Sequence, residues 1–425
     1  MISLSGTLEL RIEKPAAGGR MVARADGQVI LVAGAIPGER VVARIQRVSK
    51  GVAFAETIEV VEPSPDRREP FVDPLCGGSL YSHIAYRRQL AIKAEVIADA
   101  FTRIGRLELP GAVPVAGSPE DGYRMRARLH ARGHRLGFFR EGTHEICDAR
   151  ATRQLLPATC DVLDRLSAAM RSVGDDDIRE IELTENVDAT ERVVHLETTR
   201  PIDARLVDKL TSIDGLTPGP YVTDTLRVGD SVLTLRRHVL AFFQGNRYLL
   251  ADLVAHVVER VPIGGSLADL YAGVGLFAVA AAVTRGAGVF AVESDRHAAD
   301  DLHANLTSAG VKMMMMRGPV EGLAAGTIRA LGRRFSGPLA ETGIVDPPRT
   351  GMSRDAMDAV LGLKALRLIY VSCDVATLAR DARRIVDAGY SIARADAFDL
   401  FPNTPHVETV VVFERSASRR TPCTV

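Results

Sequence analysis

The chain has 425 residues, which is enough for two or three domains that each bury a hydrophobic core. Its 46% hydrophobic and 25% charged residues are typical of a globular protein. Because 53 basic residues balance 53 acidic ones, the net charge is zero and argues neither for nor against a nucleic-acid partner. Five cysteines, an odd number, argue against a disulfide scaffold, and neither a signal peptide nor an apolar run long enough to cross a bilayer is visible. We therefore expect a cytoplasmic enzyme that does not enter a membrane.

Residues 1–62 alternate short β-type runs with turn signals. The runs cover residues 6–12, 27–32 and 39–45, and they are separated by Gly18-Gly19, Asp26-Gly27 and Pro37-Gly38. Many short strands at this spacing predict a small β-barrel of the OB-like class. The sequence Pro63-Ser64-Pro65 then marks a linker to the next part of the chain.

A basic stretch, Tyr123–Arg140, stands out in the middle of the chain. It contains six arginines and no acidic residue, and from Arg124 to Arg132 basic and apolar residues alternate. A period of two places the basic side chains on one face of a strand. Two interpretations stay open: a solvated strand face, or a surface that binds the phosphates of a polyanion. A bound polyanion would reduce the mutual repulsion of these basic side chains, which no acidic residue within the stretch compensates.

From about residue 241 to 415, predicted strands alternate with predicted helices. We expect strands at 267–270, 288–292, 343–345 and 368–371, with helices after Gly275 and from Asp295. This order predicts a doubly wound parallel sheet. Two further strands, 392–396 and 408–414, are expected to close its edge.

A glycine loop follows the first of these strands. Gly273 and Gly275 permit a tight turn and let backbone N–H groups approach a ligand at the start of the following helix. Glu293 comes 20 residues after Gly273, at the end of the next strand, where a carboxylate can accept two hydrogen bonds from ribose hydroxyls. A structural turn is the alternative. A third glycine and a G-K-[ST] element are both missing, which argues against NAD and ATP and favours S-adenosylmethionine.

Asp346 and Cys373 each end a predicted strand, so they are expected to face each other across the ligand cleft. Asp346 begins the rigid sequence Asp-Pro-Pro-Arg-Thr-Gly. A lone cysteine is most often a small buried hydrophobic residue, as we expect for Cys160, whereas Cys373 lies between Ser372 and Asp374 at a strand end. A nucleophile beside a cofactor pocket fits methyl transfer to a carbon atom that is a weak nucleophile by itself.

Five segments together resemble the RNA 5-methyluridine methyltransferases, the uracil-C5 methylases of 23S ribosomal RNA and tRNA. The segments are 242–246, 269–277, 346–351, 372–381 and 401–408, and the resemblance covers most of the chain. It implies an α/β protein in three parts. Residues 1–62 would form an OB-like TRAM β-barrel, residues 66–240 a central α+β RNA-binding domain, and residues 241–418 a class I methyltransferase domain with a Rossmann-like doubly wound sheet. Part of 87–117 would pack on the methyltransferase domain.

The resemblance also implies a mechanism and a set of site residues. C5 of uracil does not attack a methyl sulfonium unaided, so a thiolate adds to C6, C5 takes the methyl group, and a base then removes the C5 proton. Cys373 would be the nucleophile, Glu408 the base, and Asp346 part of both the active site and the cofactor site. The residues expected at S-adenosylmethionine are Gln244, Tyr271, Gly273, Gly275, Glu293 and Asp346, and those expected at the RNA are Arg124, Arg126, Arg128 and Arg132. The target base would be splayed out into the pocket.

The cysteine pattern departs from that of the family. Many members hold an iron–sulfur cluster on four cysteines, but here Cys76 and Cys147 match only two of the positions, and Pro70 and Ser79 stand at the other two. Two thiolates are too few for a standard cluster. We therefore expect a decayed site that holds no metal and in which the two cysteines form no disulfide.

The leading hypothesis is a monomeric RNA uracil-C5 methyltransferase that uses S-adenosylmethionine. A 23S rRNA substrate is favoured over tRNA because a TRAM domain accompanies the rRNA enzymes more often. One alternative is a catalytically inactive RNA-binding protein or RNA chaperone of the same fold, against which the intact Cys373 and Glu408 argue. Another is a class I methyltransferase that acts on a protein or a small molecule, which would leave the barrel and the basic strand unexplained.

Overall fold

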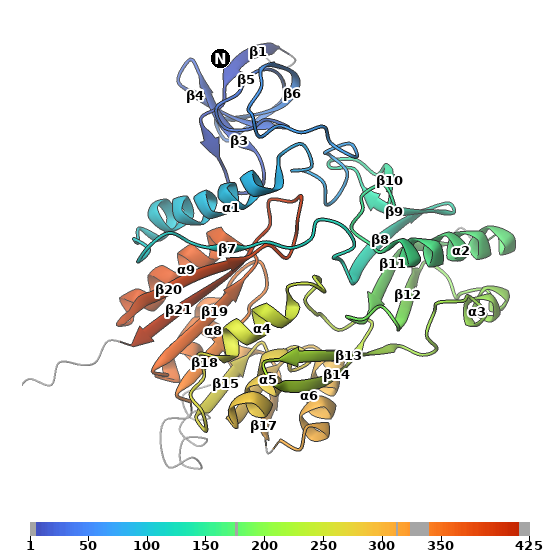
Figure 1. Ribbon diagram of the computed structural model, residues 1–425, viewed down its shortest axis with the longest axis vertical. Helices are drawn as coiled ribbons and strands as arrows, with labels where there is room; N and C mark the ends of the chain where they lie inside the picture. Colours follow the sequence, from blue (N-terminus) through green and yellow to red (C-terminus); the bar gives the residue numbers. More distant parts are fainter. Residues whose placement is uncertain (1–5, 175–176, 312, 324–339, 416–425) are drawn as a thin grey trace, which may run out of the picture.

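The computed structural model describes residues 6–174, 177–311, 313–323 and 340–415. Figure 1 shows a small β-barrel at the top, a mixed part with helix α2 on the right, and a helix-flanked sheet in the lower left. In these described ranges, no helix is long and apolar enough to cross a membrane.

The barrel is a six-stranded sheet with the order β1-β5-β6-β4-β3-β2. Its strands are β1 (Thr7–Arg11), β2 (Lys14–Pro15), β3 (Met21–Ala25), β4 (Gln28–Ala33), β5 (Arg40–Ser49) and β6 (Val52–Glu62). In β5, Val41, Ala43 and Ile45 are buried, whereas the residues between them are not. Because side chains of a strand alternate between two faces, one face of β5 lines the barrel core. Register shifts between β5 and β6 bend this pair.

The central part contains a five-stranded sheet with the order β10-β9-β8-β11-β12. Its elements are β8 (Arg126–Arg132), β9 (Arg135–Phe139), β10 (Ile146–Asp148), α2 (Pro157–Val173), β11 (Ile178–Glu185), β12 (Arg192–Thr198) and α3 (Ala204–Thr211). Helix α2 covers one face of the sheet, where Leu166 and Met170 belong to the same hydrophobic cluster as Leu129 and Ile181. This packing leaves the other face of β8 and β11 for polar side chains.

The C-terminal part is built on an eight-stranded sheet with the order β17-β16-β15-β18-β19-β21-β20-β7. Strands β15 to β19 are parallel, and β21 is antiparallel to both of its neighbours. The elements after residue 249 are α4 (Leu250–Val258), β15 (Ser266–Leu270), α5 (Leu276–Arg285), β16 (Gly288–Glu293), α6 (Arg296–Ser308), β17 (Met313–Arg317), η2 (Val320–Gly322), β18 (Thr342–Val345), α8 (Arg354–Gly362), β19 (Arg367–Ser372), α9 (Val375–Asp387), β20 (Tyr390–Phe398) and β21 (Glu408–Arg415). Helices α4 to α6 pack in one hydrophobic cluster, and α8 and α9 pack in another.

Three segments that come earlier in the chain also pack on this C-terminal sheet. Helix α1 (Tyr86–Ala100), followed by the π-helical turn Phe101–Gly105, belongs to the same hydrophobic cluster as α9. Strand β7 (Val115–Ala116) pairs with β20 and forms the outer edge of the sheet. The hairpin of β13 (Tyr221–Val228) and β14 (Ser231–His238) shares its cluster with α4, α5 and α6. Figure 1 shows α1 alongside α9 and the hairpin in front of α5 and α6.

Cys76 and Cys147 form a disulfide, with an S–S distance of 2.03 Å, so the expectation that they stay unpaired is wrong. The segment that follows the barrel lies against β9, where the N–H of Gly77 donates to the carbonyl of Phe139 at 3.0 Å. Cys147 lies on the neighbouring strand β10, opposite Phe138. The two Cα atoms are therefore only 5.8 Å apart, although 71 positions separate them in the sequence.

Candidate active site

A cavity of about 690 Å³ lies at the carboxyl ends of β15, β16, β18 and β19. Ligand clefts of open α/β sheets lie at this edge because the loops after parallel strands converge there. Among the residues expected at the site, those that line it are Arg124, Arg126, Gln244, Tyr271, Gly273, Glu293, Asp346, Cys373 and Glu408. Gly275, Arg128 and Arg132 are not among its lining residues. The fold therefore brings the expected nucleophile, base and cofactor residues to one cavity.

The glycine loop after β15 is held against the end of β16. Glu293 accepts hydrogen bonds from the N–H groups of Gly273 and Asp295, each at 2.7 Å, so its carboxylate has a fixed orientation at the cavity wall. Tyr271 has a φ of +85°, a strained value for a residue other than glycine. Gly275 has a φ of +94°, and a Cβ at this position would lie 2.8 Å from Cδ1 of Leu302. Gly275 thus lets the loop pack closely on α6 rather than face the cavity.

Three carboxyl groups lie at this site: Glu408, which is buried, and Asp346, which is half-buried, line the cavity, and Asp269 is buried in β15. Burial raises the pKa of Asp269 to about 8, and the neighbouring charge of Asp346 adds to this effect. Burial also raises the pKa of Asp346 to about 7, although Asp346 accepts a hydrogen bond from Nε2 of Gln244 at 3.3 Å. The pKa of Glu408 is raised well above its usual range by burial and by the charge of Asp346. A cation bound here would favour the ionised forms of these groups.

Cys373 and Glu408 are neighbours because of the strand pairing. Ser372, the last residue of β19, lies in register with Thr409 of the antiparallel strand β21. Cys373 follows Ser372, and Glu408 is the first residue of β21, so both side chains lie at the same end of the two strands. Burial, followed by the charge of Glu408, raises the pKa of the Cys373 thiol to about 12. The pair offers a nucleophile next to a proton acceptor.

The basic face of β8 has acidic neighbours that come from outside the stretch Tyr123–Arg140 and compensate part of its charge. Strand β11 pairs with β8 and places Glu182 opposite Arg128 and Glu180 opposite His130. Arg128 donates to Oε1 of Glu182 at 2.5 Å, and Oε2 of the same carboxylate lies 3.4 Å from Arg126. The acids come from a strand about 50 residues later in the chain, so the local sequence gave no sign of them.

Arg124 and Arg132, two further arginines of this stretch, have uncharged partners. Arg124 donates to Oε1 of Gln154 at 2.6 Å, and Arg132 donates to the carbonyl of His144 at 3.0 Å. Within the described residues, neither side chain forms an ion pair with a carboxylate. Arg124 lines the cavity, whereas Arg132 lies farther along β8 and is exposed.

The individual roles of two other lining residues were not expected from the sequence. Phe242 lines the cavity with 62% of its surface exposed, and the guanidinium of Arg126 lies 5.9 Å from its ring centre. Arg349 lines the cavity beside Cys373. Both lie in segments that resemble the family, so their segments could be predicted to belong to the site. The sequence alone does not show which residues of such a segment face the cavity.

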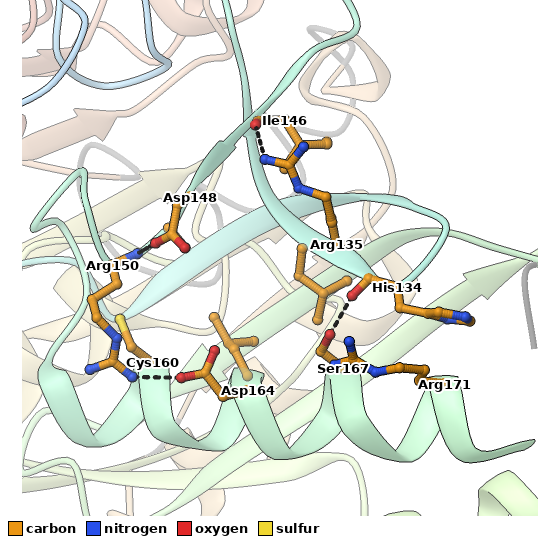
Figure 2. A pocket seen from close by; sticks show the side chains of 12 residues that line it. His134, Arg135, Ile146, Asp148, Arg150, Cys160, Asp164, Ser167 and Arg171 are labelled. Carbon is orange, nitrogen blue, oxygen red and sulfur yellow. Dashed lines mark hydrogen bonds and ion pairs between the residues drawn. The ribbon is translucent and has the colours of Figure 1, made fainter.

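A second cavity, of about 370 Å³, lies between β9, β10 and α2 (Figure 2). Two of its arginines are engaged with other groups: Arg150 donates to Asp161 and Asp164, and Arg135 donates to the carbonyl of Ile146. Burial raises the pKa of Cys160, which lines this cavity, to about 11. Cys160 is therefore a protonated, buried thiol, as expected, and the arrangement of nucleophile and base is found in the larger cavity.

Comparison with known proteins gives two matches to family models. Residues 217–416 match the tRNA (Uracil-5-)-methyltransferase family, and residues 6–58 match the TRAM domain. The first match begins before β13, in agreement with the packing of the β13–β14 hairpin on the C-terminal helices.

Relatives match over nearly the whole chain. The 23S rRNA (uracil(1939)-C(5))-methyltransferase of Halomonas elongata is 30% identical over 98% of this chain and 91% of its own length. Uncharacterized RNA methyltransferases of Streptomyces coelicolor and Nitratidesulfovibrio vulgaris are 32% and 30% identical, over 98% and 96% of this chain and 94% and 95% of their own lengths.

A solved structure matches at the level of the fold. It is the tRNA (uracil-54, C5)-methyltransferase of Pyrococcus abyssi in complex with S-adenosyl-L-homocysteine, which is 23% identical. The match covers 95% of this chain and 99% of that one, with a TM-score of 0.73. The expected fold class is confirmed: a class I methyltransferase sheet joined to an OB-like barrel and a central α+β part.

Proposed function

Because the chain belongs to the family of RNA (uracil-C5-)-methyltransferases, we propose that it methylates C5 of a uridine in 23S rRNA with S-adenosylmethionine, through a covalent adduct on Cys373. The observation that supports this most is the position of Cys373 and Glu408. They lie at the same end of β19 and β21 and line one cavity with Glu293 and Gly273. A nucleophile, a base and a ribose acceptor in one cavity are the groups that this reaction requires.

The residues of the cavity fit S-adenosylmethionine, which supplies an electrophilic methyl group on a sulfonium. Glu293, oriented by two backbone N–H groups, keeps lone pairs for the ribose hydroxyls. Tyr271 and Gly273 line the adjoining part of the cavity. Gln244 and Asp346 lie at the same cavity, and a carboxylate at Asp346 would attract the positive charge of the cofactor.

In the proposed reaction, Sγ of Cys373 adds as a thiolate to C6 of the uracil, and the electrons of the C5–C6 double bond move onto C5. C5 then forms a bond to the methyl carbon as the bond from that carbon to sulfur breaks, which leaves neutral S-adenosylhomocysteine. The carboxylate of Glu408 takes the proton from C5. The C5–C6 double bond re-forms as the C6–S bond breaks, and Cys373 leaves as a thiolate.

The uridine must leave its stack to reach Cys373, since C6 is not accessible in a folded RNA. Arg124, Arg126 and Phe242 line the same cavity and would meet the nucleotides next to the target. Arg128 and Arg132 continue along β8 and would contact the RNA farther away. The Glu182 partner of Arg128 weakens the charge that this residue offers to a phosphate.

A 23S rRNA substrate is supported by the TRAM match and by the Halomonas elongata relative, which acts on 23S rRNA. The runner-up substrate is tRNA, which is named in the family model and in the Pyrococcus abyssi structure. Residues outside the cavity would decide between them.

Incubation of the purified protein with labelled S-adenosylmethionine and unmodified 23S rRNA or tRNA tests the proposal. We expect 5-methyluridine at a single site of 23S rRNA, mapped by nuclease digestion and mass spectrometry. Methylation of tRNA alone would contradict the rRNA substrate. RNA binding without 5-methyluridine in either RNA would support the alternative of an inactive RNA-binding protein or chaperone.

A further inference from the structure

Arg349 is the cation that lies next to the thiol of Cys373. Both residues line the active-site cavity, and the positive charge of Arg349 lowers the pKa of the thiol. In the part of the chain that the structure describes, no ion pair links this guanidinium to a carboxylate. Its charge is therefore not already neutralised by a fixed partner, unlike that of Arg128.

The backbone around Arg349 is fixed to helix α9. Oγ1 of Thr377, in the first turn of α9, donates to the carbonyl of Arg349 at 3.2 Å. Arg380, one turn later, donates to the carbonyl of Thr350 at 3.1 Å. Cys373 lies just before this helix, so the start of α9 positions both the thiol and the loop that carries the guanidinium.

The groups around the thiol act on it in opposite directions. Burial and the charges of Glu408 and Asp346 raise the pKa of Cys373, whereas the positive charge of Arg349 lowers it. His406 faces the same region, but burial lowers its pKa to about 4, so it is neutral near pH 7. The carboxylate of Asp374 accepts the N–H of Thr377 at the start of α9. Arg349 is thus the group that favours a thiolate.

We propose that Arg349 stabilises the thiolate of Cys373 before and after its covalent step with the uracil. This inference rests on the proposed function, because it takes Cys373 as the nucleophile. The S–H bond breaks and its proton passes to water, while the negative charge stays on Sγ next to the guanidinium. In the adduct the sulfur is neutral. When the C6–S bond breaks, the electron pair returns to Sγ beside the same guanidinium.

The rate at which iodoacetamide alkylates Cys373 between pH 7 and 11 tests the inference, because only the thiolate reacts. Mass spectrometry of the peptide that contains Cys373 gives the rate at each pH. Arg349→Gln is expected to slow alkylation about tenfold at pH 8, because an adjacent cation lowers a pKa by about one unit or more. Arg349→Lys retains the charge and should recover most of the rate. Arg354→Gln, at an exposed position in α8, is the matched control and should alkylate like the wild type.

An unchanged pH profile in Arg349→Gln would overturn the inference, and so would a lysine variant as slow as the glutamine variant. Binding of S-adenosylhomocysteine and thermal unfolding check that each variant is folded, and Arg349→Met replaces Arg349→Gln if the latter does not fold. Failure of the proposed function gives a different result. Wild-type protein would then form no adduct with 5-fluorouridine RNA, whatever the alkylation profile, since alkylation requires no RNA.

Discussion

Lys93 of α1 forms an ion pair with Asp399 in which only 1% and 0% of the two side chains is exposed. Nζ of Lys93 also donates to the carbonyl of Phe401 at 3.1 Å. These contacts join α1 to the 399–407 segment that leads into Glu408. Each buried charge is tolerated because the other lies beside it. The segment that leads to the proposed base Glu408 is therefore held by a residue more than 300 positions earlier in the chain.

Lys93→Met should destabilise the protein, because it leaves the Asp399 carboxylate buried without a partner. We expect the free energy of unfolding in urea to fall by about 3–5 kcal/mol. The double variant Lys93→Met and Asp399→Asn should recover much of this loss, since no buried charge remains. A loss below about 1 kcal/mol in the single variant would show that water or another cation reaches Asp399.

Glu408→Gln should separate the two halves of the proposed reaction. The amide cannot accept the C5 proton, but Cys373 can still add to C6, so a covalent RNA–protein complex should accumulate on ordinary uridine RNA. Denaturing gels with labelled RNA measure this complex. Cys373→Ala should form none, even with 5-fluorouridine RNA, and should still bind the cofactor. Turnover of Glu408→Gln at the wild-type rate would assign proton removal to another group.

The raised pKa of Asp346 predicts how cofactor affinity depends on pH. Below about pH 7 the carboxyl group is protonated and neutral, and above about pH 7 it is a carboxylate that attracts a cation. The affinity for S-adenosylmethionine should therefore rise as the pH increases from about 6 to 8. Asp346→Asn should remove most of this dependence, whereas Asp252→Asn, at an exposed position of α4, should keep it. Calorimetry at several pH values measures both, and an equal slope in Asp346→Asn would exclude Asp346 as the titrating group.

The sequence predicted the C-terminal sheet well because its signals are local. Cys373 follows a run of buried β-type residues, and Glu293 ends another, so their places at strand ends could be read directly. The parallel pairing of such strands then brings their ends together without further information.

Features that depend on pairing between distant residues could not be read in this way. The acids opposite the basic face of β8 come from β11, and the Cys76–Cys147 contact forms only once the segment after the barrel lies on β9. Strand β7 has two residues, too few for a period to appear. The apolar run from Met313 forms a strand at the edge of the sheet, where Met314, Met315 and Met316 are only half-buried, and its composition alone does not show this edge position.

The Cys76–Cys147 disulfide predicts that both cysteines are oxidised and linked in the purified protein. Protein alkylated without reductant should show Cys76 and Cys147 in one linked peptide pair by mass spectrometry. Because the bond closes a loop of 71 residues, Cys76→Ser should lower the free energy of unfolding by about 2–5 kcal/mol. Cys160→Ser, which affects a free buried thiol, controls for the loss of a cysteine.

Protein purified without oxygen is expected to contain no stoichiometric iron, and finding iron would contradict the loss of the cluster.

The last prediction distinguishes two arginines of the basic stretch. Arg128 is paired with Glu182, so its charge is largely compensated before any RNA binds. Arg124 donates to the neutral amide of Gln154, so its charge remains available to a phosphate. Arg124→Gln should therefore weaken RNA binding and lower the slope of log affinity against log salt by about one unit.

Arg128→Gln should change that slope much less, although its side chain is the more exposed of the two, with 61% of its surface accessible. Filter binding of labelled RNA at several salt concentrations measures both slopes, and the affinity for the cofactor checks that each variant is folded. Equal slopes in the two variants would mean that RNA separates Arg128 from Glu182 on binding. If both variants show the wild-type salt dependence, the basic face of β8 does not contact phosphates and is simply exposed to solvent. The phosphate contacts would then have to be sought on the barrel, around Arg20 and Arg44.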